Sequence, residues 1–218
     1  MSGQAIAVLL GSAGSFEIGG TRLPDVPVGI FDMHAMAGLG DVAGFLSLTC
    51  FRTIPVTVDY AAGLLVLEDE ASLAQRAAAG TPVAVQVGVD GCSTDLKLGL
   101  ELPGGRPVSV EVDTGSEVLI LDEDCARDAG IDLHGPGVRT VAANDETGRE
   151  VVRYFTDLRG DVTVSGSPAA HVTDPPVMVQ KIIYDGLAGV RFLRNFTTTY
   201  DLARSRMIFA IPADQVTS

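Results

Sequence analysis

The chain has 218 residues, of which 46% are hydrophobic and 20% are charged, and a mean hydropathy of +0.30. A chain this apolar can bury a core, which excludes a globally disordered protein. No apolar run is long enough to span a bilayer. With 15 basic and 28 acidic residues the net charge is −13, which is the wrong sign for binding nucleic acid through its phosphates.

The cysteines and histidines predict no metal or redox centre. The three cysteines are far apart and form no Cys-x-x-Cys pair, which argues against a disulfide framework and a zinc site. The three histidines lack ligand spacing, so we expect neither a metal nor another cofactor. The apolar stretch 5–10 is short and follows no basic residue, so it predicts no signal peptide, and we expect a cytoplasmic protein with no membrane partner.

The N-terminal residues have the composition of β-structure. Short runs of Val, Ile, Leu and Thr separated by Gly, Pro and Asp recur along the whole chain and predict an all-β protein. Residues 6–10 and 26–30 are predicted strands, and Gly19-Gly20 is a predicted hairpin turn. A short helix is expected after Gly44.

A change in composition divides the chain into two parts. A predicted hairpin joins residues 56–60 to residues 64–67. The sequence then becomes acidic and Ala-rich. We interpret residues 71–82 as a linker, with or without one helical turn, and as a domain boundary.

The part after this boundary is predicted to be a run of strands with one short helix. Apolar and polar residues alternate in residues 83–89, 96–102 and 108–112, which places one face of each strand in a core. Residues 122–130 predict a helix, because acidic residues crowd its first turn and Gly130 ends it. Further strands are expected at 138–143, 150–157, 161–165 and 176–183, with a last hairpin from 197–201 to 206–211.

The two parts contain a partial internal repeat. In each part, two apolar residues and a glycine precede a helix and a hairpin. The spacing from glycine to phenylalanine is seven residues in both, from Gly44 to Phe51 and from Gly189 to Phe196. The spacing from that phenylalanine to the next repeated aspartate differs, with eight residues against five. The first part contains only the equivalent of about residues 160–211.

The stretch that carries chemistry is Asp-Thr-Gly-Ser at residues 113–116. It lies between two apolar runs, so the turn returns directly into a buried strand, and we expect Asp113 to lie deep in the structure. A buried carboxylate is costly unless it is hydrogen-bonded or shares a proton. An ordinary β-turn in which Asp113 caps the backbone is the alternative.

Together with a second stretch downstream, this sequence resembles the aspartic proteases of the retropepsin-like and pepsin-like families. The second signature is Leu187-Ala-Gly189, then Phe192-Leu193, then Tyr200-Asp201. The resemblance covers residues 82–212 and implies an acid-protease β-barrel with short helices. The implied domains are a partial first lobe at 1–70 (the C-terminal half of a lobe), the linker at 71–82, a complete retropepsin-like lobe at 83–212 and a tail at 213–218.

The resemblance also implies a role for each residue of the two signatures. Asp113 would be the catalytic carboxylate, and Thr114 would use its hydroxyl to brace the facing loop. Gly115 would let the backbone approach the carboxylates and donate an N–H to them. Ser116 would hydrogen-bond the outer oxygen of Asp113, and Gly189 would lie under the active-site loop.

The implied chemistry needs two carboxylates that hold one proton between them, so that one activates water and the other protonates the carbonyl oxygen. The chain has one Asp-Thr-Gly, and we interpret Asp32 and Asp41 as turn residues, so Asp113 is half a site. Three arrangements remain open. They are a two-lobed enzyme whose first lobe lacks its front half here, a homodimer of residues 82–212 with residues 1–70 appended, and an inactive protein that keeps the fold for binding. The polar loop 142–148 lies where the family carries its flap.

The predicted function is therefore that of an aspartic-type endopeptidase. Its partners would be a peptide or protein substrate and a second lobe or homodimer partner that supplies the other aspartate. The alternative is a catalytically inactive barrel that acts as a binding or dimerisation module. A preference for arginine over lysine, 13 against 2, is compatible with a bacterial genome rich in GC. The apolar edge at 64–67 predicts that the purified protein is oligomeric or poorly behaved.

Overall fold

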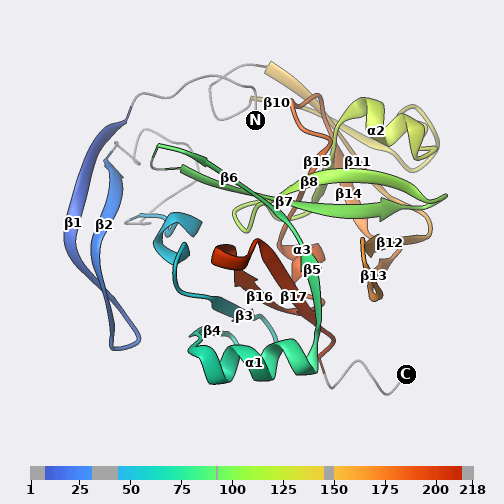
Figure 1. Ribbon diagram of the computed structural model, residues 1–218. Helices are drawn as coiled ribbons and strands as arrows, with labels where there is room; N and C mark the ends of the chain where they lie inside the picture. The colour runs from blue at the N-terminus through green and yellow to red at the C-terminus, as the bar shows by residue number, and fades with distance from the viewer. Residues whose placement is uncertain (1–7, 31–43, 92, 145–149, 213–218) are drawn as a thin grey trace.

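The computed structural model describes residues 8–30, 44–91, 93–144 and 150–212, and strands dominate it (Figure 1). The predicted all-β class is confirmed. The first nine strands are β1 (Leu9–Ile18), β2 (Thr21–Ile30), β3 (Val56–Asp59), β4 (Leu64–Leu67), β5 (Thr81–Ala84), β6 (Gln86–Asp90), β7 (Ser93–Leu102), β8 (Arg106–Val112) and β9 (Leu119–Leu121). The later strands are β10 (Arg139–Asn144), β11 (Glu150–Asp157), β12 (Asp161–Val164), β13 (Ser167–Thr173), β14 (Pro176–Val179), β15 (Gly186–Ala188), β16 (Thr197–Asp201) and β17 (Arg206–Ala210).

The helices are short. Among the described residues they are the 3₁₀ turns η2 (Leu48–Phe51) and η3 (Leu202–Arg204) and the α-helices α1 (Glu70–Ala79), α2 (Glu123–Asp128) and α3 (Val190–Leu193). Within the described ranges, none of them is both long and apolar enough to cross a membrane.

The larger sheet has ten strands in the order β10-β11-β14-β9-β15-β8-β7-β12-β13, with β6 added on β7. Burial alternates strictly along β7, where Leu96, Leu98 and Leu100 are at most 1% exposed, as the sequence pattern predicted. These leucines share one hydrophobic core with Tyr200 and Phe209 of the smaller sheet. The core of the molecule therefore lies between the two sheets.

Strand β15 crosses between the strands that flank the Asp-Thr-Gly-Ser sequence. It pairs in parallel with β8 and antiparallel with β9. The crossing is tight, because an ideal Cβ on Gly186 would lie 2.4 Å from the carbonyl oxygen of Ile120. Only glycine fits there, which explains why the crossing strand begins with this residue.

The smaller sheet joins the two parts of the chain. Its order is β4-β3-β16-β17-β5, so β3 and β4 of the first part continue a sheet of the second part. The residues 71–82 that we predicted as a linker form most of helix α1 and the start of β5. Asp69 and Ser72 form a capping box at the N-terminus of α1, and the buried Leu73 fixes the helix against the protein.

The hairpins β3–β4 and β16–β17 confirm the internal repeat. Asp59 pairs with Leu64 in the first hairpin, as Asp201 pairs with Arg206 in the second. The turns match too, because Gly63 and Ser205 both have positive φ, +66° and +49°. All these matched residues are separated in the sequence by the same 142 positions as Thr57 and Thr199.

The repeat has local twofold symmetry. Thr57 and Thr199 pair directly across β3 and β16, and their hydroxyl oxygens are 2.7 Å apart. Because each is the equivalent of the other, a local twofold axis passes between them. The proposed match of Phe51 with Phe196 is wrong, since Phe51 ends η2 whereas Phe196 follows the end of α3 at Leu193. The proposed match of Gly44 with Gly189 is wrong for the same reason, because the residue that precedes η2 as its N-cap is Ser47, 142 positions before Gly189, the N-cap of α3.

The N-terminal hairpin β1–β2 lies at the left edge of Figure 1, away from the ten-stranded sheet. Its turn is Gly19-Gly20, as predicted, and both glycines have positive φ. The strands are longer than predicted. The interpretation of Asp32 and Asp41 as turn residues concerns residues outside the described ranges.

Candidate active site

The Asp-Thr-Gly-Ser sequence forms a tight loop between β8 and β9. Asp113 follows the last residue of β8, and its N–H donates to the carbonyl oxygen of Ala188 on β15 at 3.1 Å. The N–H of Ser116 donates to the carbonyl oxygen of Asp113 at 3.2 Å, which closes the turn. The crossing strand therefore fixes where the loop begins.

Both carboxylate oxygens of Asp113 accept hydrogen bonds from the loop itself. The N–H of Gly115 donates to Oδ1 at 2.9 Å, and the hydroxyl of Ser116 donates to Oδ2 at 2.6 Å. These are the two contacts that the resemblance implied for Gly115 and Ser116. Two hydrogen bonds of this kind fix the orientation of a carboxylate.

The loop lies nearer the surface than we expected from the sequence. Asp113 and Ser116 are only partly buried, and Thr114 and Gly115 are exposed. The expectation that Asp113 lies deep in the structure is wrong, because the loop extends beyond the end of β8 at Val112 and its tip at Thr114 and Gly115 is exposed. The bracing role of Thr114 stays a prediction, and its exposed side chain is free to meet a facing loop.

Gly189 lies directly under the loop. An ideal Cβ at this residue would be 2.3 Å from the carbonyl oxygen of Val118 and 2.7 Å from that of Ser116. Gly189 also precedes α3, whose first two N–H groups donate into the same loop. Val190 donates to Ser116 and Arg191 to Glu117, each at 2.8 Å. The missing side chain thus allows the start of α3 to bond the far side of the loop.

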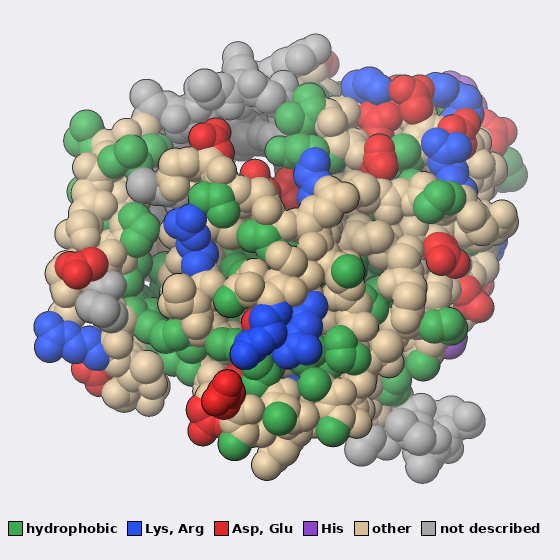
Figure 2. Space-filling model, viewed as in Figure 1, with side chains coloured by type: hydrophobic (Ala, Val, Ile, Leu, Met, Phe, Trp, Pro, Cys, Tyr) green, Lys and Arg blue, Asp and Glu red, His purple; other side chains and the backbone are tan. Residues whose placement is uncertain are grey.

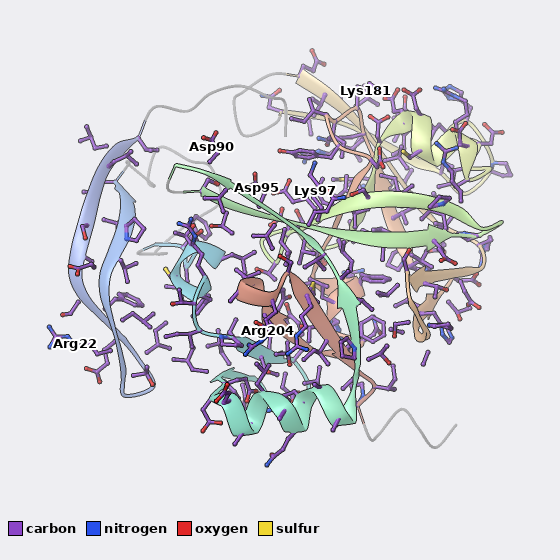
Figure 3. All side chains as sticks on the ribbon, viewed as in Figure 1. Arg22, Asp90, Asp95, Lys97, Lys181 and Arg204 are labelled. Carbon is purple, nitrogen blue, oxygen red and sulfur yellow. The ribbon has the colours of Figure 1, made fainter. Side chains whose placement is uncertain are left out.

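A second acidic residue, which our reading of the sequence missed, lies beside the loop. Glu111 lies on β8, two residues before Asp113. Its cross-strand neighbour in the pairing of β7 with β8 is Lys97. Burial, followed by the carboxylates of Asp95 and Asp113, raises the pKa of the Glu111 carboxyl above its usual value, whereas Lys97 acts in the opposite direction. Figure 3 labels Asp95 and Lys97, which lie two residues apart on β7. Strand alternation could have identified Glu111 from the sequence, because residues two apart on a strand lie on the same face of the sheet.

Within the part of the chain that the structure describes, Asp113 has no hydrogen bond to another carboxyl group. The sequence contains no second Asp-Thr-Gly. The same described residues include no cluster of three or more His, Cys, Asp or Glu side chains suited to a metal ion. The loop as it stands offers one oriented, partly exposed carboxylate.

The predicted flap region is a hairpin. Strands β10 and β11 pair from Arg139–Phe155 to Asn144–Glu150, and residues 145–149 at its tip lie outside the described residues. At the base of this hairpin is a cleft lined by Arg139, Phe155 and, from the far side of the loop, Val118. Asp113 does not line this cleft. The function of the hairpin as a flap stays a prediction.

No protein-family model matches the chain, and no curated protein matches its sequence. Among solved structures it is similar to a retropepsin-like aspartic protease from Rickettsia conorii, with 17% identity, a TM-score of 0.43, and coverage of 59% of this chain and 87% of that one. It is also similar to basic 7S globulin from soybean, with 10% identity, a TM-score of 0.46, and coverage of 87% of this chain and 63% of that one. The chain therefore spans less than two thirds of the soybean protein. Because both TM-scores are below 0.5, the fold is defined by the strand order of this chain and not by either similarity.

Proposed function

We propose that this chain provides one half of the active site of an aspartic-type endopeptidase. The observation that supports it is the Asp113 carboxylate, which is oriented by Gly115 and Ser116 and left partly exposed where β8 ends. A turn residue that only caps the backbone does not need a crossing strand and a glycine under its loop. The resemblance of both sequence signatures to aspartic proteases points to the same chemistry.

The proposed reaction is hydrolysis of a peptide bond by water. Two facing carboxylates share one proton, because like charges in contact do not both ionise. The ionised carboxylate takes a proton from water as its oxygen attacks the carbonyl carbon, and the protonated one gives its proton to the carbonyl oxygen. The tetrahedral intermediate then collapses and the C–N bond breaks. The leaving nitrogen takes the proton that the first carboxylate removed from water, and the carbonyl oxygen returns its proton to the second carboxylate. Asp113 supplies one carboxylate, and a second lobe or a second copy supplies the other.

The alternative function is binding without catalysis. It is favoured by the sequence itself, which has one Asp-Thr-Gly and no facing carboxylate among the described residues. A binding module would use the same fold and would not need an ionisable group at residue 113.

The test is cleavage of a peptide library by the protein isolated from its own cells, with Asp113→Asn as the variant. The control is Asp128→Asn. It changes an exposed carboxylate at the end of helix α2 that forms an ion pair with Arg106 of β8. We expect Asp113→Asn to lose cleavage while keeping its circular dichroism spectrum, and Asp128→Asn to keep both. Cleavage that persists unchanged in Asp113→Asn would contradict the proposed function.

A further inference from the structure

The two repeated hairpins, β3–β4 and β16–β17, differ at their outer edges. The edge of β17 is covered by another strand, and the edge of β4 is open among the described residues. In the second hairpin, β5 pairs with the outer edge of β17, from Arg206–Ala84 to Phe209–Thr81. Strand β4 occupies the equivalent place in the first hairpin, and within the described ranges no strand pairs with its outer edge. Leu64 and Leu65 of this strand are 56% and 45% exposed. An unpaired apolar edge is a site where another strand can add.

A second exposed apolar surface is formed by the residues just before η2, the helix of the first repeat. Leu187 and Ala188, just before α3, are 2% and 0% exposed, because β15 lies between β8 and β9. Phe45 and Leu46, just before η2, are 62% and 45% exposed. Two large apolar side chains are therefore in water at the place where the other repeat is covered by strands.

The two open surfaces lack the same part of the chain. In the second repeat, the edge of β17 is covered by β5, and the residues before α3 are covered by β8 and β9. All three strands lie in the continuous stretch 81–121, which also contains Asp113. One segment of the same kind would thus cover both open surfaces of the first repeat.

Copies of this chain cannot supply that segment to every repeat. The described residues of each chain hold two hairpins of the repeat and one stretch of the kind formed by residues 81–121. In any assembly of copies, half of the hairpins would remain uncovered. The edge of β16 that a second copy could use is also occupied, because β3 pairs with it.

We propose that the surface formed by β4, Phe45 and Leu46 binds a polypeptide segment outside residues 1–218 that carries the second aspartate. The segment resembles residues 81–121 of this chain, with one strand followed by two apolar strands joined by an Asp-Thr-Gly loop. The local twofold axis between Thr57 and Thr199 places this loop opposite Asp113. The inference rests on the proposed function and names the partner of its active site. Figure 2 shows further hydrophobic side chains at its left, on the N-terminal hairpin. This hairpin belongs to the first part of the chain, as do β4, Phe45 and Leu46.

The experiment is site-specific photo-crosslinking of the C-terminally tagged protein in its own cells. A benzophenone amino acid replaces Phe45 in one variant and Leu65 in another. Ile183 is the control, because it is 62% exposed but lies in the second repeat, outside the proposed surface. We expect Phe45 and Leu65 to crosslink to one continuous segment that contains an Asp-Thr-Gly sequence, and Ile183 not to crosslink to it.

Crosslinks from Phe45 and Leu65 to residues 1–218 of a second copy, to a segment without the aspartate pattern, or to nothing would overturn the inference. Its failure is distinguishable from that of the proposed function. If purified residues 1–218 cleave a peptide library alone and Asp113→Asn abolishes the cleavage, the inference is wrong and the proposed function stands. If native cleavage does not depend on Asp113, the proposed function is wrong.

Discussion

Replacing Gly189 by alanine should destabilise the protein through the active-site loop. The added Cβ would lie 2.3 Å from the carbonyl oxygen of Val118, whereas ordinary contacts begin near 3.4 Å. The loop must therefore move by about 1 Å. The bond from Val190 to Ser116, now 2.8 Å, would then exceed hydrogen-bonding distance. Overpacking of about 1–3 kcal/mol and two lost hydrogen bonds of about 1 kcal/mol each give a loss of about 3–5 kcal/mol.

The assay is urea unfolding followed by far-UV circular dichroism, at a protein concentration low enough to limit association. Gly44→Ala is the matched control, because an ideal Cβ on Gly44 meets nothing within 4 Å. We expect Gly189→Ala to lower the midpoint strongly with an unchanged slope, and Gly44→Ala to leave it unchanged. A loss below about 1 kcal/mol for Gly189→Ala would refute the close packing of loop and helix.

Three further outcomes follow from the same contacts. Ser116→Ala removes the 2.6 Å hydrogen bond to Asp113 and should lower kcat of the native enzyme about 10- to 100-fold. Ser116→Thr keeps the hydroxyl and should restore part of the loss. Equal kcat for Ser116→Ala and the unchanged enzyme would contradict a role for this contact. Asp122→Ala should lower the free energy of unfolding by about 2–4 kcal/mol, because Asp122 caps α2 and accepts from the N–H of Ile182; a change below 1 kcal/mol would oppose this. Purified residues 1–218 should associate through the Leu64–Leu67 edge, and a monomer by light scattering would count against an open edge.

The same aspartate sets a pH dependence of stability. Burial acts to raise the pKa of Asp122, but hydrogen bonds from the backbone of Asp124 and Ile182 and from Lys181 outweigh it and hold the pKa below its usual value. The stabilisation is therefore present above about pH 4 and is lost as the pH falls through the lowered pKa. Asp122→Asn should flatten this acid limb in unfolding curves measured from pH 6 to pH 2. An unchanged limb would show that other carboxyl groups control it.

Local patterns in the sequence predicted much of the larger sheet. Strict alternation gave β7 and β8, and the acidic first turn gave α2. Strand β13 was missed because residues 167–173 include Pro168 and few β-branched residues, and it is held as a strand by pairing with β12. Helix α1 was interpreted as a linker, although Asp69 and Ser72 carry its cap signal.

The candidate site was predictable in its parts and not in its setting. The signatures gave Asp113, its hydrogen-bonding neighbours and Gly189 under the loop, because these contacts depend on backbone geometry close to the loop. The depth of Asp113 was not predictable, since it depends on what covers the loop from outside. Glu111 was missed although strand alternation places it near Asp113, because the burial and the nearby Asp95 carboxylate that raise its pKa depend on how the strands pack.

Whether the second carboxylate of the site comes from a segment outside residues 1–218 is tested most directly by native mass spectrometry of the active species from its own cells. We expect a species heavier than the 22.7 kDa of residues 1–218. It should contain one Asp-Thr-Gly from this chain and a second Asp-Thr-Gly from the added segment. An active species that contains residues 1–218 alone, in one copy or more, would contradict this arrangement.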